Sequence, residues 1–172
     1  MNFLRATLAT AGAFLFAAPA QALTHDQGTA LFQQLNRIGV TVNVGINNCP
    51  TNYLGYYHPG TATMTLCVHH HGYTHDTLVH ESWHVVQDCL DGQVGDGKLL
   101  SMGEALNQMA ATQTDKSLTR VWANHMAQGI TEQELAHVKR AYPSRQVALE
   151  WEATVMEKSP DAVINALRDL CL

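Results

Sequence analysis

Residues 78–89 read LVHESWHVVQDC, a stretch in which two histidines and an acid stand among apolar side chains. His80 and His84 are four positions apart, so both project from one face of an α-helix and can hold one ion. Glu81 is offset from His80 by about 100° around the helix axis, where its carboxylate can reach a water on that ion. The apolar and small neighbours favour a buried helix. The stretch therefore predicts a metal-binding helix.

The same residues suit zinc-dependent hydrolysis. Two neutral imidazoles and a third protein group hold Zn²⁺, and a fourth position stays open for water. A neighbouring carboxylate takes a proton from that water as it attacks a carbonyl group. We therefore predict His80 and His84 as metal ligands, Glu81 as the catalytic residue and Zn²⁺ as the cofactor. The alternatives are another divalent ion in the same site, or a core helix whose histidines are only hydrogen-bonded.

The rest of the chain predicts an α+β fold, with a small antiparallel sheet followed by a mainly helical region. Residues 25–37 have apolar side chains at helical spacing, and Gly39 ends that helix. Residues 40–44 and 61–68 alternate between apolar and polar side chains, as strands with one buried face do, and a turn-rich segment separates them. Further helices are expected over 74–90, 101–112, 116–127, 131–141, 145–158 and 160–171.

The first 22 residues have the features of a secretory signal peptide. Arg5 supplies a positive charge, an apolar stretch follows, and Ala20-Gln21-Ala22 forms a small-x-small cleavage site. The apolar stretch is shorter than the roughly 20 residues that span a bilayer, and no later segment is long and apolar enough. We therefore predict cleavage after Ala22 and a single domain over 23–172. The protein is expected to be periplasmic or secreted, with no membrane span in the mature chain.

The composition argues against a nucleic-acid partner. The 172 residues carry a net charge of −5 and contain no concentrated run of Lys and Arg, which nucleic-acid binding requires. The length suits one domain with an ordinary hydrophobic core.

Four cysteines favour two disulfides, because their number is even and the protein is predicted to be exported. Three pairings are open. Turn-forming residues between Cys49 and Cys67 favour a bond between these two, and Cys89 then pairs with Cys171.

The stretch over 78–89 resembles the active-site helix of zincin metallopeptidases, and among these it is most similar to small exported zincin-like proteins of bacteria. The resemblance covers this helix and the strand before it, with a weaker match near Glu152. It implies a zincin-like metallopeptidase domain in which the strand over 61–68 binds the substrate backbone by strand addition. Metzincins have a third histidine six residues after the second, where this chain has Leu90. The resemblance is therefore to gluzincins, in which a glutamate from a later helix is the third ligand.

Three glutamates are candidates for that third ligand. Glu150 and Glu152 lie in the segment ALEWEA, which resembles the Glu-x-Glu-Ala element of small gluzincins, where the glutamate just before the alanine is the usual ligand. Glu152 shares a helix face with apolar side chains, whereas Glu150 shares one with polar side chains that should face water. A carboxylate on an apolar face is unfavourable unless it is paired or bound to a metal. We therefore predict Glu152 as the third ligand, with Glu104 and Glu150 as alternatives.

These features together predict an exported zinc metallopeptidase that hydrolyses peptide bonds in a peptide or protein substrate. Glu81 would activate the zinc-bound water, and Tyr142 is a further candidate for stabilising the oxyanion. The main alternative is a zincin-fold protein that binds a metal or a partner without turnover. A metal-dependent amidase acting on cell-wall peptides is the third interpretation.

Overall fold

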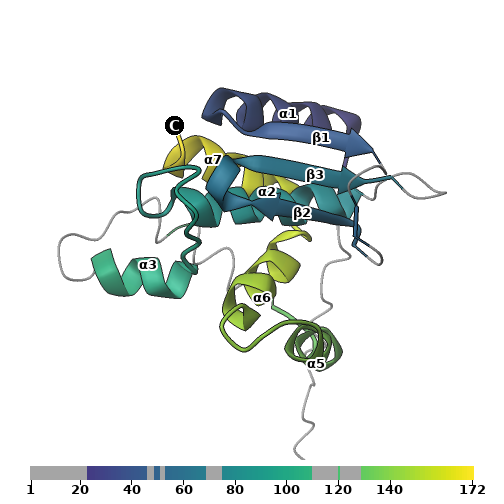
Figure 1. The fold of residues 1–172 in the computed structure, drawn as a ribbon, viewed down its shortest axis with the longest axis vertical. Helices are drawn as coiled ribbons and strands as arrows, with labels where there is room; N and C mark the ends of the chain where they lie inside the picture. The colour runs from purple at the N-terminus through teal and green to yellow at the C-terminus, as the bar shows by residue number, and fades with distance from the viewer. Residues whose placement is uncertain (1–22, 46–48, 51–52, 69–74, 110–119, 121–128) are drawn as a thin grey trace, which may run out of the picture.

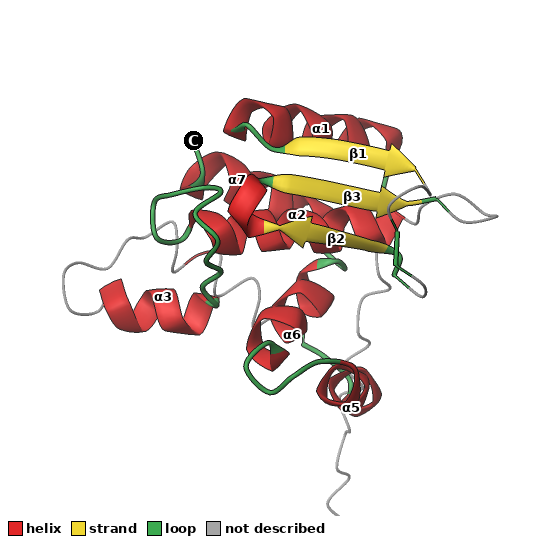
Figure 2. Cartoon of the chain, in the orientation of Figure 1, coloured by secondary structure: helices red, strands yellow, loops and turns green. Residues whose placement is uncertain are grey.

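The protein has an α+β fold, as its sequence predicts, with one layer of three strands packed against helices (Figures 1 and 2). The computed structural model describes residues 23–45, 49–50, 53–68, 75–109, 120 and 129–172. The strands are β1 (Thr41–Gly45), β2 (Gly55–His58) and β3 (Thr63–Cys67), with a 3₁₀ turn, η1 (Pro59–Thr61), before β3. The helices are α1 (His25–Ile38), α2 (His75–Cys89), α3 (Met102–Met109), α5 (Glu132–Ala141), α6 (Val147–Met156) and α7 (Pro160–Leu170).

Two sequence-based predictions lie outside the described residues. They are the signal peptide over 1–22 and, apart from Arg120, the helix over 116–127.

The sheet is mixed, which corrects the prediction of an antiparallel sheet. β1 pairs with β3 in parallel, so that Thr41 lies opposite Thr63. β2 pairs with the other side of β3 in the antiparallel direction, which gives the order β1-β3-β2. The sequence pattern did not predict β2, because this strand has only four residues and lies within the turn-rich segment. Periodicity identifies a strand but does not identify its neighbours.

β2 is an edge strand, whereas β3 is central and has partners on both sides. The backbone carbonyl of Leu54 accepts a hydrogen bond from the N–H of Cys67. Because backbone direction alternates along an antiparallel pair, Gly55 and Tyr57 turn their N–H and C=O groups away from β3. β3 therefore has no free edge for the strand addition expected at 61–68, and the edge strands among the described residues are β1 and β2.

Helix ends follow the signals that the sequence carries. Gly39 ends α1 with φ +92°, a left-handed conformation that glycine adopts without a steric penalty. Thr131 caps α5, where its side chain accepts from the Glu134 N–H and the Glu134 side chain accepts from the Thr131 N–H. Pro160 occupies the first turn of α7, where a missing N–H breaks no helical hydrogen bond.

Helix α2 forms the centre of the hydrophobic core. From residue 77 to residue 90, every residue except His80 is buried. The sheet lies on one side of α2, and α1, α6 and α7 contact its other sides. The segment with the two histidines is therefore carried by the most enclosed helix of the described chain, as its apolar composition predicts.

Two disulfides fix the ends of the central elements. Cys49 is bonded to Cys67 at the end of β3, and Cys89 at the end of α2 is bonded to Cys171 after α7. Both pairings confirm the sequence-based prediction, and two disulfides fit an extracellular or periplasmic protein. Among the described helices, none is long and apolar enough to cross a membrane.

Candidate metal centre

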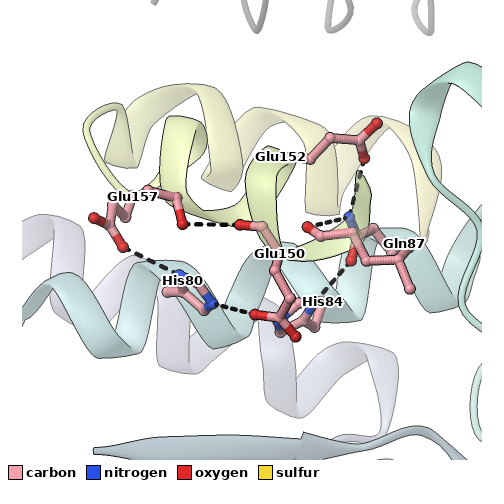
Figure 3. Close-up of polar contacts among 8 residues, drawn as sticks. His80, His84, Gln87, Glu150, Glu152 and Glu157 are labelled. Carbon is pink, nitrogen blue, oxygen red and sulfur yellow. Dashed lines mark hydrogen bonds and ion pairs between the residues drawn. The ribbon is translucent and has the colours of Figure 1, made fainter. Parts of the chain in front are cut away.

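His80 and His84 lie side by side on the face of α2 that meets α6, as their four-residue spacing predicts (Figure 3). Their ring centroids are 5.1 Å apart, and the rings meet edge to face at 77°. His84 is buried, with 6% of its surface exposed, and His80 is partly buried. Two imidazoles are therefore held next to each other at the boundary between the core and a cleft.

Glu150 of α6 brings a carboxylate to both histidines (Figure 3). Its Oε2 atom is 3.4 Å from Nε2 of His80 and 3.6 Å from Nε2 of His84. Tetrahedral zinc with bonds of about 2.0–2.2 Å places neighbouring ligand atoms about 3.3–3.5 Å apart. The ligand atoms of the three residues all lie within 4.8 Å of one another. Their spacing therefore fits a single bound metal ion with little rearrangement.

The hydrogen bonds of the two rings turn both Nε2 atoms toward Glu150. Nδ1 of His80 is 3.1 Å from Oε2 of Glu157, and a carboxylate oxygen can only accept, so this nitrogen carries the proton. Nδ1 of His84 is 2.7 Å from Oε1 of Gln87, which accepts in the same way. A neutral imidazole then has a lone pair on Nε2. When both rings are neutral, two lone pairs and one carboxylate face the same point, so this donor set would fit a cation.

The pKa values of the three groups indicate that the centre favours positive charge. Burial lowers the pKa of His80, but its hydrogen bonds to Glu150 and Glu157 outweigh that effect and raise the pKa to about 10. Burial also lowers the pKa of His84, and the hydrogen bond to Glu150 more than reverses this shift. Burial raises the pKa of Glu150, yet its hydrogen bonds to the two histidines bring it down to about 2. Protons and a metal ion would therefore compete for the Nε2 atoms of the two histidines.

Glu81 lies beside this cluster and is itself buried, with 6% of its surface exposed. Burial raises the pKa of its carboxyl group, and the charges of His84 and His80 oppose that rise. The backbone of Tyr57, on the outer edge of β2, forms a hydrogen bond with the Glu81 carboxyl group. A buried carboxyl group with a raised pKa, fixed next to a cluster that could hold a metal ion, is suited to proton transfer.

A cleft of about 620 Å³ opens onto His80 and Glu81. Gly55 and Leu54 at the β2 edge line one side, and Tyr142 at the end of α5 lines the other. Burial raises the pKa of Tyr142, and the negative charges of Glu150 and Glu81 raise it further. The tyrosine hydroxyl therefore keeps its proton and remains a hydrogen-bond donor. No motif spacing in the sequence supports Tyr142 as a site residue, but in the structure it lines the cleft.

Glu152 does not reach the histidines, so the structure replaces it with Glu150 as the candidate third ligand. Glu152 is buried, with 2% of its surface exposed, as the apolar face of α6 predicts. Its carboxylate accepts hydrogen bonds from the Met102 N–H and the Gln87 side chain instead. Glu104 is not part of the histidine cluster either. It caps the start of α3, where its carboxylate accepts from the N–H and the hydroxyl of Ser101. Glu150 is not on a solvated face, since its side chain is only 14% exposed.

Two residues that contact the histidines were not predicted from the sequence, namely Glu157 and Gln87. Gln87 follows His84 by three positions, a spacing that places both on one helix face and was an available signal. Glu157 lies far from His80 in the sequence, and nothing in the pattern connects them. No protein-family model, curated protein or solved structure matches the chain, so the interpretation of the site depends on its own geometry.

Proposed function

We propose that the protein is an exported zinc-dependent metallopeptidase of the gluzincin type, with His80, His84 and Glu150 as the zinc ligands. The observation that supports this most strongly is the convergence of the three ligand atoms within 4.8 Å of one another, beside the buried acid Glu81 and an open cleft. Zn²⁺ bound there would lower the pKa of a water molecule and polarise the carbonyl group of the substrate.

Glu81 would carry the proton transfers of hydrolysis. It takes a proton from water as the oxygen attacks the peptide carbonyl carbon, and it gives this proton to the amine nitrogen as the C–N bond breaks. Burial raises the pKa of Glu81 above the usual value of a glutamate, which favours its taking up and holding a proton between the two transfers. The hydrogen bond from the Tyr57 backbone keeps the carboxylate in a fixed orientation between these steps.

The walls of the cleft would bind and polarise the substrate. Gly55 directs its backbone N–H and C=O away from β3, so an extended peptide can pair with this edge as an added strand. Tyr142, on the opposite side, keeps its proton and can donate a hydrogen bond to the oxygen that becomes negative in the transition state. The proposed reaction therefore uses the Gly55 backbone on one side of the cleft and the Tyr142 hydroxyl on the other.

The test is the substitution Glu81→Gln, which preserves the shape of the side chain and removes its basicity. We expect the variant to bind one zinc ion per chain with wild-type affinity and to lose about 10²- to 10⁴-fold in kcat/KM on a fluorogenic peptide library. The matched control is Glu104→Gln, an acid that caps α3 outside the cleft and should leave hydrolysis unchanged. Wild-type rates for Glu81→Gln would refute the mechanism. Zinc-loaded wild-type protein that binds peptides without cleaving them would show a non-catalytic binding protein instead.

A further inference from the structure

Glu152 is a buried acid that the proposed mechanism does not use. The Met102 N–H donates to both of its carboxylate oxygens, at 2.9 and 3.0 Å, and Nε2 of Gln87 donates to Oε2 at 3.0 Å. Removing a carboxylate from water raises the free energy of the folded state unless such donors replace the water. All of its neighbours in these contacts are donors, so the carboxylate acts as an acceptor on every side.

These contacts determine which way the Gln87 amide faces. Its Nε2 donates to the backbone carbonyl of Leu149 at 3.1 Å and to the Glu152 carboxylate, and neither of these groups can donate in return. The amide nitrogen is therefore fixed toward α6, and the amide oxygen is left to face His84 (Figure 3). Because that oxygen accepts from Nδ1, His84 must carry its proton on Nδ1.

From this chain of contacts we infer that Glu152 is a positioning residue, which acts through Gln87 to make His84 present an unprotonated Nε2 to the metal. The inference rests on the proposed metal site. It gives Glu152 a role in metal binding without direct ligation. It also explains why a carboxylate stands on the apolar face of α6, where the sequence pattern favoured a ligand.

The same carboxylate connects the metal site to α3. Met102 is the first residue of α3, and the N–H groups of a first helical turn have no partner within the helix. Glu152 supplies an acceptor and a negative charge at that end, both of which stabilise a helix start. Zinc binding at His84 and docking of α3 are then favourably coupled, and by linkage each stabilises the other. Zinc should therefore slow hydrogen exchange at the Met102 N–H.

The substitution Glu152→Gln tests this inference, because a carboxamide places an NH₂ group where only acceptors fit. If the oxygen of the introduced carboxamide still accepts from the Met102 N–H, the NH₂ group of this carboxamide faces the NH₂ group of Gln87. Two donors cannot pair, so the Gln87 amide flips and its oxygen accepts from the introduced NH₂ group. Gln87 then donates to Nδ1 of His84, and the proton of His84 moves to Nε2, which can no longer bind metal. We expect a loss of about 10- to 100-fold in zinc affinity, the range found for partners of ligating histidines. At a pH high enough to leave the His84 ring neutral, the ¹⁵N chemical shifts of that ring should show the change of tautomer in the metal-free protein.

Two controls separate positioning from a general loss of structure. Glu104→Gln also removes a carboxylate from the start of α3 but does not touch Gln87, so its zinc affinity should stay within about twofold of wild type. In a Gln87→Leu background, Glu152→Gln should cause no further loss, because its effect passes through Gln87. Wild-type affinity for Glu152→Gln, an equal loss for Glu104→Gln, or additive losses in the double variant would each overturn the inference. Wild-type protein that binds no zinc would overturn the proposed function itself, and none of these measurements requires hydrolysis.

Discussion

At Gly55 the edge strand β2 packs against α2, and there is no room for a side chain. A Cβ atom built on Gly55 would lie 2.6 Å from Cγ2 of Thr77 and 3.3 Å from Cγ of Glu81. It would also lie 3.0 Å from the backbone oxygen of Thr65. Carbon atoms in favourable contact are about 3.5–4.0 Å apart. The substitution Gly55→Ala must therefore push β2 away from the helix that carries His80 and Glu81.

The expected cost of this overpacking is about 1–3 kcal/mol in the free energy of unfolding. For a domain of this size, each 1 kcal/mol lowers Tm by about 2–4 °C, so the variant should melt roughly 2–12 °C below wild type. Urea unfolding of the metal-free protein, followed by circular dichroism, measures the loss directly. The m value should not change, because the surface exposed on unfolding is the same.

A double-mutant cycle with Thr77→Ser identifies the cause of the loss. This second substitution removes the Cγ2 atom that makes the closest contact, so Gly55→Ala should cost less in the Thr77→Ser background than in wild type. Part of the cost should remain, because the backbone oxygen of Thr65 cannot be removed. A change below about 0.5 kcal/mol for Gly55→Ala, or the same cost in both backgrounds, would refute the close packing of β2 on α2.

Three further predictions concern the disulfides and the histidines. Replacing Cys89 and Cys171 by serine should destabilise the protein by about 4.5 kcal/mol, because this disulfide closes a loop of 82 residues. Replacing Cys49 and Cys67 should cost about 3.2 kcal/mol, because that loop has 18 residues. Equal losses in urea unfolding would contradict this loop-entropy argument. Zinc binding at pH 7 should release at least one proton, because the pKa of His80 is raised to about 10. Calorimetry in buffers of different ionisation enthalpy should detect this proton release. Binding without proton release would exclude His80 as a ligand. In the metal-free protein, the raised pKa of His80 adds stability that is complete below pH 6.5 and is lost as the pH rises toward 10. The urea midpoint of unfolding should therefore fall between pH 7 and 9, and it should fall less in His80→Gln. The same fall in both proteins would show that His80 does not contribute.

The parts of the site that the sequence predicts correctly are those encoded by local spacing. His80 and His84 share a face because they are four residues apart on a helix, and the apolar residues around them bury that helix. The capping box at Thr131 and the left-handed Gly39 also depend only on nearby residues. Such signals are read within one or two helical turns, and the structure confirms each of them.

The parts that the sequence does not predict depend on which distant elements meet. The apolar face of α6 predicts that Glu152 is buried, but it does not reveal that Met102 and Gln87, 50 and 65 residues away, supply the donors. Glu150 was expected to face water because the helices that cover it were unknown. The neighbours of β3 were unpredictable for the same reason, since alternation along a strand shows which residues face the core but not which strands lie beside it.

The most direct test of the metal centre is a crystal structure of the zinc-loaded protein with anomalous scattering measured at the zinc edge. We expect one ion between α2 and α6, bound by Nε2 of His80 and Nε2 of His84 at about 2.0–2.1 Å and by a Glu150 oxygen at about 2.0–2.2 Å. Glu152 should still accept from Gln87 and Met102. An ion bound elsewhere, or one ligated by Glu152 in place of Glu150, would contradict the proposed centre.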